Sequence, residues 1–122
     1  MKTDRELLEL AAKAAGIKIL RCRLDDPMWN DMLLVERKHG SNDAVGWNPL
    51  TNDGDALRLA VKLGLCVDSC PAAEPSESRV QAYIGEDWEP IERVDELHNN
   101  DPYAATRRAI VRAAASIGEQ MK

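Results

Sequence analysis

Aromatic side chains are scarce in this sequence: it has no phenylalanine, and aromatic residues make up only 4% of it. Alanine and leucine, with 16 and 13 residues, supply much of the apolar content instead. Both residue types favour helices. A chain of 122 residues can bury one hydrophobic core without disulfide or metal cross-links, so we expect a single domain over residues 1–122. That length excludes a multidomain enzyme.

Cysteines and long apolar runs are also few. The three cysteines, Cys22, Cys66 and Cys70, are an odd number, which suits reduced thiols better than a disulfide framework. The longest uninterrupted apolar run covers only residues 32–35, which is far too short to span a membrane. The charged N-terminal residues do not resemble a signal peptide. We therefore expect a cytoplasmic protein that does not bind membranes.

The sequence also has no excess of positively charged residues. Sixteen Lys and Arg residues stand against 21 Asp and Glu residues, for a formal net charge of -5. Such a chain has no general attraction to phosphate backbones, so nucleic acid is an unexpected partner. Binding to DNA or RNA would need a local basic patch. The candidate patch lies near the C-terminus, where Arg107, Arg108 and Arg112 are close together in the sequence.

Motifs of several enzyme classes are absent. Neither of the common glycine-rich phosphate loops occurs. Cys66 and Cys70 have the spacing C-x3-C, but no second pair is present to complete a zinc site, and Cys66 is better explained as a core residue. Residues 51–55 superficially resemble a calcium loop. If Gly54 is aligned with the glycine that such a loop requires, however, Pro49 and Ala60 fall at positions that should hold calcium ligands. No cofactor, metal ion or catalytic residue is predicted.

Capping signals and periodicity indicate helices and strands in alternation. Three helices are predicted, over residues 4–15, 53–63 and 101–118. Alternating apolar residues predict strands over 17–23, 31–37, 45–47, 65–67 and 79–84. Residues 71–78 are expected to form a loop, and residues 88–97 are ambiguous. In the second helix, Leu57 and Val61 belong to the side that is expected to be buried.

The mixed order of these elements favours an α+β fold over a doubly wound parallel sheet. We expect an α/β/α sandwich in which three helices pack on one largely antiparallel sheet of four or five strands.

Polar residues at the start of the second helix are the candidate ligand site: Asn48, Thr51, Asp53 and Asp55. The free amides of a helix N-terminus favour anions, so the expected ligand is an anionic metabolite or a nucleotide. The alternative is that these side chains only cap the helix.

Three further residues are candidates for binding a partner protein: Trp29, Arg108 and Arg112. Tryptophan anchors interfaces as well as cores. Trp47 is expected in the core and Trp29 at the surface. For the arginines, the alternative is an ordinary charged outer face of a helix.

Two stretches of the chain resemble small proteins encoded by tailed phages and prophages, of the NinX-like or phage ABA-sandwich type. The first is W-N-P-L-T-N-D-G-D-A-L-R-L-A-V at residues 47–61, and the second is D-P-Y-A-A-T-R-R-A-I-V-R-A-A at residues 101–114. With the opening E-L-L-E-L-A-A-K-A-A-G at residues 6–16, the resemblance covers most of the chain. It implies an α/β/α sandwich and an origin in an infected or lysogenic bacterial cell, and it implies no activity.

From these observations we expect a non-enzymatic accessory protein that binds a host or phage protein. The alternative is a small-ligand binding domain or minor enzyme that uses residues 48–55. A weaker alternative is nucleic-acid binding through the C-terminal helix.

Overall fold

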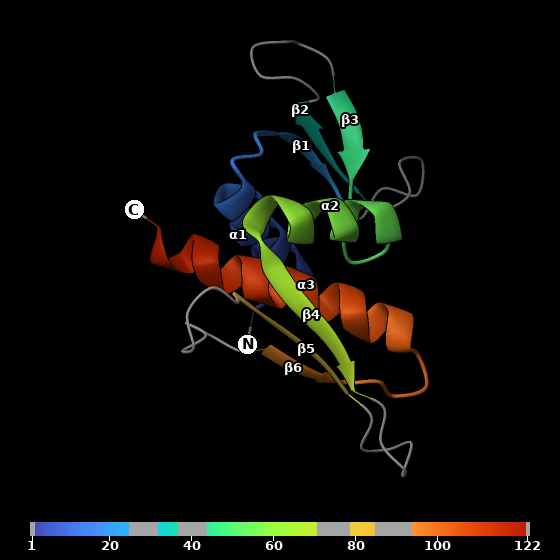
Figure 1. The fold of residues 1–122 in the computed structure, drawn as a ribbon. Coiled ribbons are helices and arrows are strands. Elements are labelled where there is room, and N and C mark those ends of the chain that lie inside the picture. The colour runs from blue at the N-terminus through green and yellow to red at the C-terminus, as the bar shows by residue number, and fades with distance from the viewer. Residues whose placement is uncertain (1, 25–31, 37–43, 71–78, 85–93, 122) are drawn as a thin grey trace.

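A computed structural model describes residues 2–24, 32–36, 44–70, 79–84 and 94–121 of the chain. In these ranges a helix followed by three strands occurs twice, and a third helix comes last (Figure 1). The elements are α1 (Asp4–Ala15), β1 (Ile19–Arg23), β2 (Met32–Glu36), β3 (Ala44–Trp47), α2 (Asp53–Leu63), β4 (Leu65–Cys70), β5 (Arg79–Ile84), β6 (Val94–Leu97) and α3 (Pro102–Gln120).

Each helix begins at a polar residue that caps it. The side chains of Thr3, Asn52 and Asp101 each accept a hydrogen bond from the backbone amide three residues further on, which satisfies one of the free donors of a helix start. Gly16 and Gly64 end α1 and α2 in the left-handed region, with φ angles of 69° and 67°. The predicted bounds of α1 and α2 are confirmed.

The strands form two antiparallel sheets rather than one. Sheet A has the order β1-β2-β3 and sheet B the order β4-β5-β6. The α+β class is confirmed, but the expected single sheet of four or five strands is wrong. Each group of three consecutive strands pairs only with its own members, and helix residues fill the space between the two groups. Residues 71–78, expected as a loop, lie outside the described ranges.

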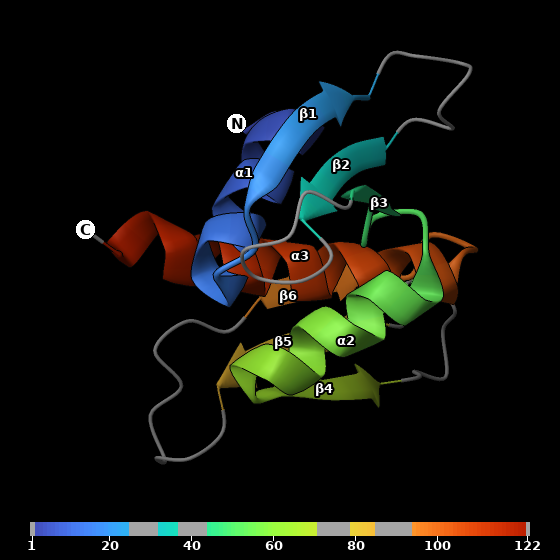
Figure 2. The same cartoon turned by 90° about the horizontal axis from the view of Figure 1, so that it is seen from above.

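The helices lie between the two sheets (Figures 1 and 2). On one side, Leu33, Val35 and Trp47 of sheet A are buried in a cluster with residues of all three helices. On the other side, sheet B packs on an alanine face of α3 that consists of Ala105, Ala109 and Ala113. The layer order is therefore sheet, helices, sheet, the reverse of the expected sandwich. The expectation that Trp47 is a core residue is confirmed.

Helices α1 and α3 approach each other closely where Gly118 faces the backbone of Leu10. A methyl group at Gly118 would overlap the carbonyl of Leu10. Gly118 was expected to end the last helix, but α3 continues to Gln120 and Gly118 is buried within it. The glycine is needed for space between two helices, not for ending one of them.

We predict that Gly118→Ala lowers the free energy of unfolding by about 1 kcal/mol or more, because overpacking against backbone outweighs the gain in helix propensity. Chemical denaturation measures the change. Ser116→Ala, on the same helix, is the matched control and should change stability little. A Gly118→Ala protein as stable as the wild type would contradict the close contact.

Candidate functional site

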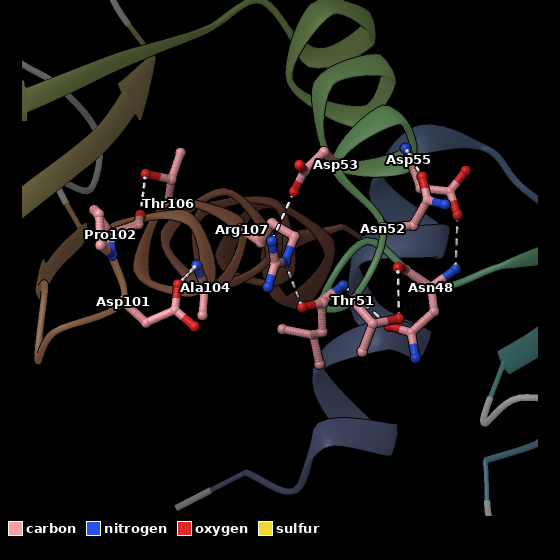
Figure 3. Close-up of polar contacts among 11 residues, drawn as sticks. Asn48, Thr51, Asn52, Asp53, Asp55, Asp101, Pro102, Ala104, Thr106 and Arg107 are labelled. Atoms are coloured by element: carbon pink, nitrogen blue, oxygen red, sulfur yellow. Dashed lines mark hydrogen bonds and ion pairs between the residues drawn. The ribbon is translucent and has the colours of Figure 1, made fainter.

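The predicted ligand residues lie together in the turn that connects β3 to α2 (Figure 3). Asn48 is buried, with 6% of its surface exposed. Its side-chain Oδ1 accepts a hydrogen bond from the Leu50 amide at 3.0 Å, and its backbone carbonyl accepts from the amides of Thr51 and Asn52 at 3.1 and 2.9 Å. The Thr51 hydroxyl also points to this carbonyl, at 3.5 Å. Asn48 therefore closes the turn through its own side chain and backbone.

Asp55 folds back onto the same turn. Its Oδ2 accepts from the Asn48 amide at 3.0 Å, and its Oδ1 pairs with Nη2 of Arg58 at 2.7 Å. The Asp55 amide donates to the side chain of Asn52 at 2.9 Å. The carboxylate and the capped amide thus both have partners within this turn.

Arg107 of α3 connects this turn to the last helix. Its Nε donates to the Leu50 carbonyl at 2.8 Å, and its Nη1 pairs with Asp53 at 2.7 Å (Figure 3). The Arg107 side chain is 18% exposed, whereas that of Asp53 is 75% exposed. Sequence reasoning placed Arg107 on a charged outer face, because a doublet of arginines does not indicate which member points inward. Asn48, Thr51, Asp53 and Asp55 are therefore brought together, in an arrangement that favours the capping interpretation.

Beside this turn lies a hollow of about 500 Å³ between the end of α1, sheet A and α2. Two cations, Arg58 and Lys62, and two carboxylates, Glu36 and Asp55, line it together with Trp47. A small ligand in this space would contact Asn52 and Asp55. A second hollow, of about 370 Å³, is lined by Asn48 and Thr51.

The candidate partner residues on α3 are engaged within the chain. Arg112 pairs with Glu96 at 2.5 Å and donates to the Asp95 carbonyl at 3.2 Å. Arg108 lies 3.3 Å from Asp4 and 3.7 Å from Glu96. These pairs tie α3 to α1 and β6, and they set a carboxylate beside each of the two arginines, which reduces the attraction of this part of α3 for a phosphate backbone. Trp29 lies outside the described residues.

The structure gives no sign of a metal centre in the parts of the chain that it describes. There, no three His, Cys, Asp or Glu side chains are grouped so that they could hold a metal ion. Cys22 and Cys66 are free thiols.

Among the described residues, no helix is both long and apolar enough to span a membrane.

Comparison of the chain with protein-family models, with curated proteins and with solved structures gave no match. The resemblance to phage proteins therefore stays a prediction.

Sequence reasoning did not predict which large apolar side chains are the most exposed. Val61, Tyr103 and Leu57 are 72%, 71% and 64% exposed. The expectation that Leu57 and Val61 face the core is wrong, because α2 buries Ala56, Leu59 and Ala60 instead. Periodicity alone could not distinguish these two faces, since both carry apolar residues.

Leu57 and Val61 lie one turn apart on α2, whereas Tyr103 lies in the first turn of α3. Both α2 residues follow Asp53 along one side of the helix. We call Leu57 and Val61 the α2 patch.

We predict that Arg107→Ala lowers the free energy of unfolding by about 1–3 kcal/mol, because the part-buried Leu50 carbonyl loses its donor. Asp53→Asn should cost no more than about 1 kcal/mol, since it removes only an exposed ion pair. Urea denaturation of both variants tests the difference. Equal losses would mean that the ion pair, and not the bond to Leu50, holds α3 to the turn.

Proposed function

We propose that the protein is a non-enzymatic accessory protein that binds a host or phage protein through the α2 patch. The observation that carries this proposal is the exposure of Leu57 and Val61 on successive turns of α2. Single exposed apolar residues are common on protein surfaces. Two large aliphatic side chains exposed on one side of a helix form an apolar surface of the kind found at interfaces.

The placement of the α2 patch supports this proposal. Its two aliphatic side chains stand on a helix anchored by caps at both ends, so they offer apolar area that requires little ordering on binding. Arg58 and Lys62 follow on the neighbouring face of α2 and can select a partner by charge.

The other polar candidates support the same choice. The residues at the start of α2 bond one another, and Arg108 and Arg112 pair with carboxylates of α1 and β6. Nucleic-acid binding through α3 has the least support for this reason. The resemblance to phage proteins favours a role in the cytoplasm of an infected or lysogenic bacterial cell.

We predict that tagged protein retains a stoichiometric partner from nuclease-treated bacterial lysate at both low and moderate salt. Leu57→Gln combined with Val61→Gln should remove that partner while leaving the thermal midpoint nearly unchanged, because both side chains are already exposed. Mass spectrometry identifies the retained proteins. Leu20→Gln on β1, at a site that is 38% exposed, is the control and should retain the partner.

Two results would contradict the proposal. One is the absence of any partner above a tag-only control. The other is a partner that the double variant retains as well as the wild type does.

A second candidate function rests on the hollow beside α2, where Arg58 and Lys62 lie with Trp47. These residues could hold a small anionic ligand. A thermal-shift screen of nucleotides and phosphorylated metabolites tests it, since a ligand at one hundred times its Kd stabilises a protein by about 2.7 kcal/mol. Arg58→Gln with Lys62→Gln should abolish any shift. A shift that survives this double substitution would exclude the hollow as the site.

A further inference from the structure

Helix α2 carries two cations beside the α2 patch. Arg58 and Lys62 each directly follow a residue of the patch, so they also lie one turn apart and form a second row on the neighbouring side of the helix. Among the described residues, the two patch residues are the only large apolar side chains that are more than half exposed and one turn apart. The α2 patch therefore has charge of one sign along its side.

Both cations are exposed to solvent. The Arg58 side chain is 75% exposed, whereas that of Asp55, with which it pairs, is 13% exposed. The Asp55 carboxylate is held in the turn before α2, where the Asn48 amide donates to it. Lys62 is exposed, and its side chain forms no ion pair or hydrogen bond with another described residue. The second and third turns of α2 therefore present positive charge next to their apolar side chains.

The first turn of α2 presents the opposite sign. Asp53 is mostly exposed, whereas Arg107, with which it pairs, is mostly buried and donates to the Leu50 carbonyl. The exposed charge thus changes from negative to positive along the helix. An anionic group of a partner is therefore attracted to the part of α2 that carries the apolar side chains, and it is repelled from the first turn.

We propose that the partner bound by the α2 patch is an acidic amphipathic helix. Its aliphatic residues, one turn apart, pack on Leu57 and Val61, and its neighbouring Asp or Glu residues pair with Arg58 and Lys62. A helix fits because its own side chains repeat at one turn and pack beside those of α2. Strand addition is not available here, since the backbone of a helix is bonded internally. This inference rests on the proposed function and gives the chemistry of its partner.

The charges of α2 favour this partner over a second copy of the chain. In a two-fold contact that sets Leu57 of one copy against Val61 of the other, Arg58 of the first copy would meet Lys62 of the second. Like charges placed opposite each other across an interface are unfavourable. An acidic helix avoids this repulsion and gives both cations a partner.

The charges also favour an acidic helix over an anionic membrane surface. Helices that lie on membranes have a strongly charged face opposite a large apolar face. Helix α2 exposes only two aliphatic side chains, and its exposed first-turn carboxylate, Asp53, would be repelled by anionic lipid.

Selection from a displayed library of helix-forming peptides tests the proposal without a known partner. The wild-type chain should enrich peptides that combine aliphatic residues one turn apart with Asp or Glu beside them. A selected peptide, made synthetically, should bind more weakly as salt is raised. A proline at the centre of the peptide should abolish binding, because it breaks the helix.

Variants of the chain test which residues hold the peptide. Lys62→Glu should weaken binding by about tenfold or more, because the carboxylates of the peptide then meet a like charge. A peptide with Lys in place of its Asp and Glu should bind Lys62→Glu better than the wild type. Lys18→Glu, at another exposed lysine, is the matched control and should bind the acidic peptide like the wild type. Thermal midpoints show that the variants are folded.

Several results would overturn the proposal. They are the absence of enrichment, enrichment of basic or uncharged peptides, and selected peptides that bind Lys62→Glu as tightly as the wild type. Binding to phosphatidylglycerol vesicles in place of acidic peptides would assign the α2 patch to a membrane. A dimer in sedimentation velocity that Leu57→Gln with Val61→Gln abolishes would assign it to a second copy.

Failure of this inference can be distinguished from failure of the proposed function. A lysate partner that Leu57→Gln with Val61→Gln removes, together with no selection of acidic helices, would keep the proposed function and reject the acidic helix. Acidic helices that are selected while the lysate supplies no partner would keep the chemistry of the surface and reject a bacterial protein as its partner.

Discussion

The structure depends on one constraint, which is that α3 must be narrow enough to lie between a helix and a sheet. Its alanines at 105, 109 and 113 contact sheet B, and a second group of small and aliphatic residues contacts α1. Where α1 and α3 come closest, even a methyl group is too large. The alanines of α3 suit this arrangement, because bulky side chains on this helix would separate the layers.

The same arrangement explains why the polar residues at the start of α2 have little capacity left for a ligand. The chain must leave sheet A and enter a helix within a few residues, at a place where Asn48 is buried. Buried polar groups need hydrogen-bond partners. Asn48, Asp55 and Arg107 provide them by bonding to backbone groups of this turn. The proposed binding of a partner therefore rests on the exposed side chains of α2 and not on this polar turn.

Local signals in the sequence were sufficient for α1 and α2, whereas non-local contacts decided the role of Gly118 in α3 and the arrangement of the strands. Thr3, Gly16 and Gly64 marked the ends of α1 and α2 because capping involves only neighbouring residues. The split into two sheets depends on which strands pair in space. The alternation of apolar and polar residues along a strand does not determine this. Leu8 of α1 and Leu57 of α2 follow the same local pattern, yet Leu8 is fully buried in a cluster that includes α3 residues, and Leu57 is exposed. For the site, the cluster of residues 48–55 was predictable, but the inward direction of Arg107 and the exposure of Leu57 were not.

Helix α3 packs against both α1 and sheet B, and this has a consequence for how the protein folds during synthesis. A ribosome synthesises all six strands before it reaches α3, and each strand meander can form its own hydrogen bonds as it emerges. Yet the apolar side chains of sheet B are covered by α3, and α1 packs against the same helix. Sheet B therefore lacks its cover until α3 has been synthesised, whereas sheet A can already pack on α1 and α2.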